Sequence, residues 1–352
     1  MRVLFIASDT KALGGIQQYN RKFIGALRGL GHEVYLIELK SGNVFAGILF
    51  VLKSIVKSAL WRPDAIICAH INYSPIGLFI NKFLGREYIV CTHGVDVWDI
   101  KNSLQRMALR EAKLITTVAE FTRNKIVNQL PETKDRIYLL YNPIDGNLFR
   151  PKAKPLALVK KYKLRGRKVI LTIGRLSAAE GYKGYDRVIM ALPQILKVVP
   201  NAVYVLIGDG DDAPRVQELI KSLGLENRVI VPGAYPNEKL PDFYNLADVF
   251  TMPSKSEGAP AVFVEALACG VPVIAGNRDG SATPLQGGEV GLLIDPESVS
   301  EISSAVISVL KKRVKKNLLD PKFLRRKTLE RFGLNRFPEK VNEMLNRFLT
   351  NA

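Results

Sequence analysis

The chain has 352 residues, of which 47% are hydrophobic, and a formal net charge of +18. This length accommodates two domains of ordinary size. The chain lacks a run of about 18 uncharged apolar residues and a signal-peptide cleavage pattern, so we expect a cytoplasmic protein without a transmembrane helix. Cys68, Cys91 and Cys269 lack metal-ligand spacing and are expected to be reduced core thiols.

The basic excess points to an anionic partner. Lys and Arg number 51 against 33 Asp and Glu, so the acids are too few to pair most of the bases. Nucleic acid, anionic lipid and a phosphorylated substrate would all suit this charge. A solvated Lys/Arg surface is the alternative explanation, and composition alone leaves both open.

The first half of the chain alternates strands and helices. Residues 2–8 form a short apolar run typical of a buried parallel strand, followed by Gly14 and Gly15, a helix, and a second strand ending near Ile37. Gly14 and Gly15 would let the backbone approach an anion at a helix N-terminus, although a tight turn is the simpler explanation of the two glycines alone. Further strands are expected at 65–69, 88–92, 114–118 and 136–140. This alternation predicts a parallel sheet covered on both faces.

The segment 43–61, NVFAGILFVLKSIVKSALW, is strongly apolar. Lys53 and Lys57 lie one helical turn apart within it, and Trp61 follows a turn later. One interpretation is a core-packed helix with one wet edge. The other is a helix that lies in a membrane interface, where the lysines meet anionic head groups.

The second half repeats the plan of the first. Pro151 and Pro155 lie in an irregular basic stretch where we place the linker, which gives domains at 1–150 and 151–335. Strands are expected at 168–173, 202–208, 229–231, 249–252 and 271–275. Basic helices follow Lys311, and a final helix at about 336–352 is expected to pack on the first domain. The sequence thus predicts an α/β fold of two Rossmann-like, doubly wound domains facing a central cleft, with ligands beyond the strands' carboxyl ends.

Arg175 and Lys183 flank the loop after the first strand of the second domain. Two cations at one strand–helix loop suit a diphosphate, because Arg provides a bidentate fork and Lys a point charge. The alternative is that they are ordinary surface bases.

Glu257 and Glu265 bracket the start of an apolar helix between Pro260 and Gly270. A carboxylate on such a helix is costly unless it is paired, so either the protein or a ligand supplies donors. The amides of Gly258, Ala259 and Ala261 at the helix N-terminus could hold phosphate, and Glu265 could accept hydrogen bonds from a vicinal diol such as a ribose. The alternative is two buried carboxylates satisfied by protein donors.

The stretch EGAPAVFVEALACGVPVIA resembles the motif of retaining GT-B glycosyltransferases, specifically family 4, which place two acids with seven residues between them. The resemblance spans nearly the whole chain. Its ordered motifs are GGIQQYNRKFIGALRGLGHEV near the start, THG at Thr92–Gly94, YNPID at Tyr141–Asp145, GRL and KG around Arg175 and Lys183, IGDG at Ile207–Gly210, and GLLIDP at Gly291–Pro296.

The resemblance implies a role for each matching residue. Gly15, next to Gly14, would bring its backbone to the donor phosphates, and Arg175 and Lys183 would bind the diphosphate. Glu257 would contact the donor sugar and Glu265 the ribose. The remaining contacts would come from His93, near the transferred sugar, and from the backbone around Gly233–Tyr235, near the base. A lone His93 would more often be structural, but its THG setting favours function.

The expected reaction is transfer of a hexose from a UDP- or GDP-linked donor to a saccharide or lipid-linked acceptor, with retention. No metal or further cofactor is expected, because the cations replace it and Asp211-Asp212 lies in a turn. The loop 279–283 departs from the family's GGxxE pattern, which leaves the donor sugar open.

We expect no nucleic-acid partner, and a peripheral location on the cytoplasmic membrane face through 43–61 and the basic faces. The alternatives are a glycosyl phosphorylase or sugar-nucleotide epimerase on the same fold, and a non-catalytic basic protein that binds nucleic acid or membrane.

Overall fold

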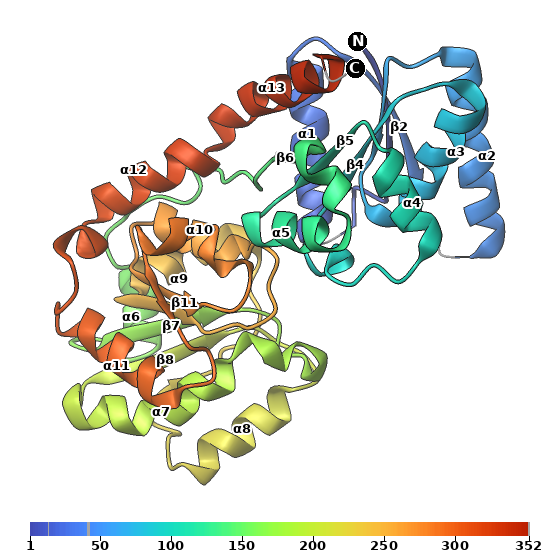
Figure 1. Cartoon of the computed structure of the whole chain (residues 1–352). Helices are drawn as coiled ribbons and strands as arrows, with labels where there is room; N and C mark the ends of the chain where they lie inside the picture. The colour runs from blue at the N-terminus through green and yellow to red at the C-terminus, as the bar shows by residue number, and fades with distance from the viewer. Residues whose placement is uncertain (13, 41–42, 351–352) are drawn as a thin grey trace. The chain divides into compact units, whose positions relative to one another are not determined.

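The computed structural model describes residues 1–12, 14–40 and 43–350, which form two compact units. The first unit contains Met1–Pro143 and Leu334–Ala352, and the second contains Ile144–Gly333. The chain therefore leaves the first unit after Pro143 and returns to it at Leu334. In Figure 1 the first unit combines the blue N-terminal elements with the dark red C-terminal helix.

The first unit is built on a six-stranded parallel sheet of order β2-β1-β3-β4-β5-β6. Its central strand β1 is buried from Val3 to Ala7, because helices cover both faces of the sheet. The strands are β1 (Arg2–Ser8), β2 (Glu33–Leu39), β3 (Ala65–Cys68), β4 (Tyr88–Thr92), β5 (Leu114–Thr117) and β6 (Ile137–Leu139). The helices are α1 (Gly15–Gly29), α2 (Val44–Trp61), α3 (Ser74–Leu84), α4 (Ser103–Glu111), α5 (Glu120–Gln129) and α13 (Phe337–Thr350).

Aromatic packing joins the C-terminal helix to the N-terminal sheet. Phe23 of α1 lies edge-on to Phe5 of β1, with ring centroids 5.6 Å apart, and to Phe337 of α13, at 6.2 Å. All three side chains are buried. The last helix of the chain therefore completes the core that the first strand begins.

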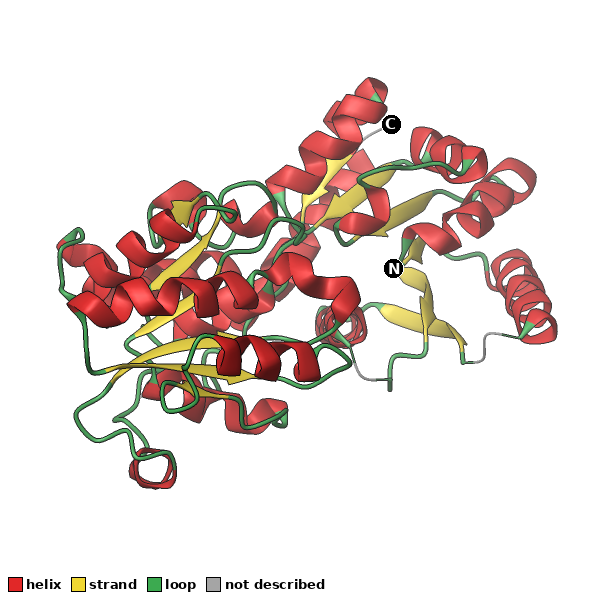
Figure 2. Cartoon of the chain, turned by 90° about the horizontal axis from the view of Figure 1, so that it is seen from below, coloured by secondary structure: helices red, strands yellow, loops and turns green. Residues whose placement is uncertain are grey.

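The second unit contains another six-stranded parallel sheet, of order β12-β11-β10-β7-β8-β9. Figure 2 shows strands with helices on their faces. The strands are β7 (Lys168–Ile173), β8 (Ala202–Ile207), β9 (Val229–Ile230), β10 (Val249–Met252), β11 (Val273–Gly276) and β12 (Leu292–Ile294). The helices are α6 (Leu156–Lys161), α7 (Tyr185–Val198), α8 (Ala213–Ser222), α9 (Leu240–Leu246), α10 (Ala261–Ala268), α11 (Val299–Leu310) and α12 (Pro321–Phe332).

The predicted fold class, two doubly wound parallel sheets, is confirmed. The edge strand Leu292–Ile294 was not predicted from the sequence. Helix α7 begins two residues before the expected position 187. All three cysteines are buried and free, as expected.

Helix α2 differs from two expectations, that the chain has no helix apolar enough to span a membrane and that 43–61 packs in the core. It is long and apolar enough to cross a membrane by length and composition, with a mean hydropathy of 1.8, although no such stretch was expected. Lys53 and Lys57 do not lower the mean hydropathy of the helix enough to outweigh its many aliphatic side chains. It is also not core-packed, because only 17% of the helix is buried.

Two loops of the second unit approach each other so closely at Gly184 that only glycine fits there without a collision. Gly184 has φ +75° at the start of α7, and a Cβ there would collide with the carbonyl oxygen of Pro253 after β10. Gly184→Ala should therefore lower the free energy of unfolding by more than about 1 kcal/mol. Gly181→Ala is the matched control, because a Cβ at Gly181 meets nothing within 4 Å. Chemical denaturation of both variants checks this, and equal stability would contradict it.

Candidate active site

A buried ion pair joins the loops that follow β7 and β10. Lys183 Nζ lies 2.5 Å from Glu257 Oε1 and 3.4 Å from Glu180 Oε2. The side chains of Lys183 and Glu257 are only 14% and 16% exposed. Arg175 is largely exposed and also pairs with Glu180. Glu180, a carboxylate that was not predicted from the sequence, therefore contacts two predicted residues, Arg175 and Lys183, and Lys183 joins it to the third, Glu257.

The pKa values of the pair reflect burial and mutual attraction. Burial by itself would lower the pKa of Lys183, but the charge of Glu257 and its hydrogen bond raise it above the ordinary value. Burial raises the pKa of Glu257, and Lys183 opposes that shift without cancelling it. Lys183 therefore stays cationic at neutral pH and is paired with Glu257 and Glu180.

Asp279 holds the loop that carries Glu257. Its side chain is 2% exposed, and Oδ2 accepts hydrogen bonds from the Glu257 amide and the Ser254 hydroxyl, both at 2.8 Å. Oδ1 accepts from the Ser281 amide at 2.9 Å. Burial raises the pKa of Asp279, and these donors act against that shift. The loop that departs from the family pattern thus supports the backbone of Glu257, a role the sequence analysis did not assign.

The backbones of the same two loops touch at Gly280. Its amide donates to the Glu257 carbonyl at 2.8 Å, and a Cβ on Gly280 would collide with the Gly258 carbonyl oxygen. No described residue accepts a hydrogen bond from the amides of Gly258 or Ala259. These amides precede α10, which begins at Ala261, so they are available to an anion.

Glu265 lies within α10 and is 9% exposed. Its Oε2 accepts a hydrogen bond of 2.6 Å from the buried hydroxyl of Tyr244 in α9. Burial, reinforced by the charge of Glu265, raises the pKa of Tyr244 well above its ordinary value, so the phenol stays protonated and donates. A protein hydroxyl therefore already binds at least one oxygen of Glu265, the carboxylate that was predicted from the sequence to bind a ribose.

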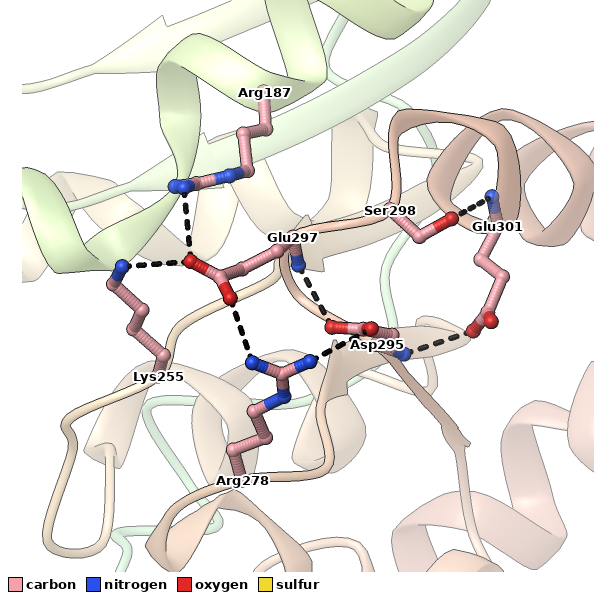
Figure 3. A network of polar contacts seen from close by, with 7 residues as sticks. All are labelled: Arg187, Lys255, Arg278, Asp295, Glu297, Ser298 and Glu301. Carbon is pink, nitrogen blue, oxygen red and sulfur yellow. Dashed lines mark hydrogen bonds and ion pairs between the residues drawn. The ribbon is translucent and has the colours of Figure 1, made fainter.

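An ion-pair network lies beside these loops (Figure 3). Glu297, after β12, accepts from Lys255 at 2.9 Å and from Arg278 at 2.6 Å, and Arg187 of α7 lies 3.5 Å away. Arg278 also pairs with Asp295 at 2.8 Å. Hydrogen bonding from Lys255, together with its charge and that of Arg278, lowers the pKa of Glu297. Exposed pairs contribute little singly, but this set ties together the chain after β10, β11 and β12.

The loop after the edge strand β9 carries Gly233 and Tyr235. The Gly233 carbonyl accepts from the Gly208 amide at 3.1 Å, which joins this loop to the end of β8. The Tyr235 ring packs on Phe243, with centroids 4.6 Å apart. Its hydroxyl lies 2.8 Å from that of Tyr162, and this hydrogen bond, followed by that of Lys161, lowers the pKa of Tyr235.

In the first unit, His93 follows β4. Its Nε2 donates to the Ala69 carbonyl at 2.8 Å. His70 stacks on His93 with centroids 5.9 Å apart, and its Nε2 lies 3.8 Å from Asp96. Burial lowers the pKa of His70, Asp96 raises it, and His93 lowers it further. His70 and Asp96 were missed, although His70 follows β3 at the same sheet edge.

The two predicted glycines of the first unit lie where the sequence analysis expected them. Gly14 has φ +150° at the N-cap of α1, and α1 begins at Gly15. No described side chain caps this end of the helix. Within residues 1–12, 14–40 and 43–350, no group of three or more His, Cys, Asp or Glu side chains is arranged to hold a metal ion.

Two doubly wound parallel sheets with polar side chains at the strands' carboxyl ends define the GT-B fold. The chain belongs to the glycosyl transferases group 1 family, whose model matches residues 157–322. It is 32% identical over 349 residues to the GDP-mannose-dependent α-(1-6)-phosphatidylinositol monomannoside mannosyltransferase of Mycobacterium tuberculosis, covering 88% of this chain and 89% of that protein. The chain is therefore a glycosyltransferase, as predicted, and not a non-catalytic binding protein.

Solved structures support the fold independently. HepE from Anabaena in complex with UDP aligns with a TM-score of 0.79 at 21% identity, covering 98% of this chain and all of that one (100%). Sucrose-phosphate synthase from Thermosynechococcus elongatus aligns with a TM-score of 0.80 at 18% identity over 100% of both chains. At these identities the likeness establishes the fold alone.

The hydrogen bonds of Asp279 predict a large effect of its removal. Asp279→Ala leaves the buried Ser254 hydroxyl and the Glu257 amide without their acceptor, so we expect a loss of about 2–4 kcal/mol in the free energy of unfolding. Asp279→Asn, which keeps one acceptor oxygen, should lose less. The control is Asp99→Ala, because Asp99 is 74% exposed in a surface ion pair. Urea unfolding of the three variants measures this, and an Asp279→Ala variant as stable as the control would contradict it.

Proposed function

We propose that the chain transfers a hexose from a nucleoside-diphosphate sugar to a hydroxyl group of a glycan, glycolipid or lipid-linked saccharide. The observation that carries this proposal is the Lys183–Glu257 pair with Arg175 beside it, at the carboxyl ends of β7 and β10. The Mycobacterium tuberculosis relative is named for GDP-mannose, and the HepE structure contains UDP. We therefore propose a UDP- or GDP-linked donor.

The two cations have different parts in this proposal. Lys183 is buried and held by two carboxylates, so its charge is fixed in place before a donor arrives. Arg175 is exposed and pairs with Glu180, and incoming phosphate oxygens can replace that carboxylate as the acceptor of its guanidinium. Together they offset the negative charge that develops on the leaving diphosphate. The amides of Gly258 and Ala259, with that of Ala261 at the start of α10, add donors for the same phosphates.

The remaining predicted residues are proposed to contact the rest of the donor. Glu257 would orient the sugar, Glu265 the ribose, and the backbone at Gly233 and Tyr235 the base. In the first unit, Gly14 and Gly15 would approach the phosphates, and His93 would lie near the transferred sugar.

We propose that the anomeric configuration is retained. In this reaction the bond between the anomeric carbon and the diphosphate oxygen breaks, and the acceptor oxygen bonds to the same face of that carbon. The acceptor's proton passes to the leaving phosphate oxygen, so the charges balance without a covalent enzyme intermediate. Lys183 and Arg175 stabilise the departing anion, which removes the need for a divalent metal.

The acceptor class suits a peripheral location on the cytoplasmic face of a membrane. A lipid-linked saccharide presents its hydroxyl groups at that surface, and an enzyme with a formal net charge of +18 is attracted to anionic head groups. No nucleic-acid partner is proposed.

Donor binding can be measured as stabilisation against heat. In a panel of UDP- and GDP-sugars, a donor at about 100 times its Kd should stabilise the chain by about 2.7 kcal/mol. Arg175→Gln should weaken nucleotide binding on the order of tenfold or more, because a hydrogen-bonded charge is lost. Arg165→Gln, which removes an exposed arginine of the same unit, is the control. If no nucleotide or nucleotide sugar raised the Tm, the proposal would fail.

The transfer chemistry makes a second prediction. With the preferred donor, release of nucleoside diphosphate should depend on an acceptor and should continue in excess EDTA, because the cations replace a metal. Arg175→Gln should lower kcat/KM by about 100-fold while Arg165→Gln leaves it unchanged. Activity abolished by EDTA and restored by Mg²⁺ or Mn²⁺ would overturn the metal-independent mechanism. Retention is read directly from the anomeric NMR signals of the product.

A further inference from the structure

Helix α2 presents its small polar residues to the protein and its large apolar residues to the outside. Its buried residues are Phe50, Ser54 and Ser58, which form one stripe at spacings of four. The two serine hydroxyls donate within the helix, Ser54 to the Phe50 carbonyl and Ser58 to the Ser54 carbonyl, each at 2.8 Å. A helix that packs on a protein core normally has the opposite arrangement.

The exposed side of α2 is aliphatic and aromatic along its whole length. The large apolar residues that are at least about one-third exposed are Val44, Phe45, Ile48, Leu49, Val51, Leu52, Val56 and Leu60. Helix α3 packs beside α2 and adds Phe79 and Phe83, which are 44% and 71% exposed and contact each other. Contiguous apolar surface of this kind marks an interaction site. We call these ten residues the apolar face.

A groove of about 600 Å³ runs between α2 and the edge strand β2 and continues the apolar face. Leu49, Leu52, Val56 and Leu60 line it from the helix. The lining also contains Glu38, whose Oε1 accepts hydrogen bonds from the Thr10 amide and hydroxyl at 2.8 and 2.6 Å. Glu38 is thus held against Thr10, and the lining contains three lysines, Lys40, Lys53 and Lys57, against this one acid.

Aromatic and basic groups lie together along this groove. Lys57 Nζ lies 3.8 Å from the centre of the Tyr35 ring and 5.0 Å from that of Trp61. Lys40 and Lys53 also line the groove, and the helix Val44–Trp61 contains no acidic residue. Tyr, Trp and Lys, with an apolar body and a polar end, are the residues that favour the boundary between lipid and water.

The sheet excludes a membrane-spanning role for α2, although the helix is long and apolar enough. β2 precedes α2 and β3 follows it, and β1 pairs in parallel with both. The ends of a spanning helix would emerge on opposite sides of a bilayer, which would separate these strands. The helix can therefore only lie along a surface.

We propose that α2 and the apolar face dock in the plane of an anionic phospholipid bilayer, with Lys40, Lys53 and Lys57 at the phosphate level. Charge decides between this occupant and a second copy of the chain. A symmetric self-interface would bring the lysines of two copies together, whereas anionic head groups attract them. The inference extends the proposed peripheral location and does not depend on the identity of the donor or the acceptor.

Co-sedimentation of the full chain with vesicles tests the inference without any nucleotide. We expect binding to phosphatidylcholine vesicles that contain about one-third phosphatidylglycerol, and much weaker binding to phosphatidylcholine alone. The triple change Leu52→Ser, Val56→Ser, Leu60→Ser should reduce partitioning at least about tenfold, because three aliphatic side chains are lost from the interface. Lys53→Gln with Lys57→Gln should reduce it on the order of tenfold as well.

Two matched controls test whether vesicle binding is specific to the apolar face. One tests nonspecific binding by other exposed apolar side chains, and the other tests binding by lysines elsewhere on the surface. Leu104→Ser, Leu156→Ser and Leu349→Ser remove exposed leucines elsewhere, and Lys221→Gln with Lys311→Gln removes exposed lysines of the second unit. Both controls should bind vesicles like the wild type. Circular dichroism and the Tm verify that each variant is folded.

A spectroscopic readout reports the position of the helix itself. In a Trp98→Phe background, Trp61 is the only tryptophan, and its emission should shift to the blue on anionic vesicles. Equal vesicle binding by the wild type and the α2 variants would overturn the inference. So would loss of binding only in the lysine control. A wild-type dimer that becomes monomeric in the triple serine variant, with no binding to vesicles, would assign the face to self-association instead.

Discussion

The architecture of the candidate site depends on keeping one lysine charged inside the protein. Lys183 is 14% exposed, and a buried cation is tolerated only where carboxylates surround it. Glu180 and Glu257 fulfil this requirement from two different loops, so the charge that would bind a diphosphate also joins the ends of β7 and β10. Removing one partner of such a pair typically costs 3–5 kcal/mol, because the other is left buried and unpaired. The Lys183–Glu257 ion pair therefore both stabilises the two loops and positions the cation that is proposed to bind the diphosphate.

Much of the fold follows from local sequence rules. Short apolar runs and glycine-marked turns predict eleven of the twelve strands in the described residues, since a strand covered on both faces needs no alternation. The site residues Arg175, Lys183 and Glu257 were predicted because they follow such strands, and parallel strands bring their carboxyl ends to one edge. One edge strand, Leu292–Ile294, was not predicted, whereas the edge strands β2, β6 and β9 were.

Two of the missed residues act over long separations in the sequence. Asp279 binds the Glu257 amide and His70 lies beside Asp96, contacts that no spacing rule reveals. Glu180 lies three residues before Lys183, and that spacing alone does not distinguish it from an ordinary surface acid. The same limit explains α2: a helix that is apolar almost all round has no periodicity to reveal which side faces the protein. Only packing showed that Ser54 and Ser58 face inward.

The two carboxylates of the seven-residue motif lie in different environments, although the sequence treats them alike. Glu257 precedes α10 and meets a cation, whereas Glu265 is the fifth residue of the helix and accepts a hydrogen bond from the phenol of Tyr244. The helix between the acids fixes their separation, and it can do so only while Asp279 holds the preceding loop against it.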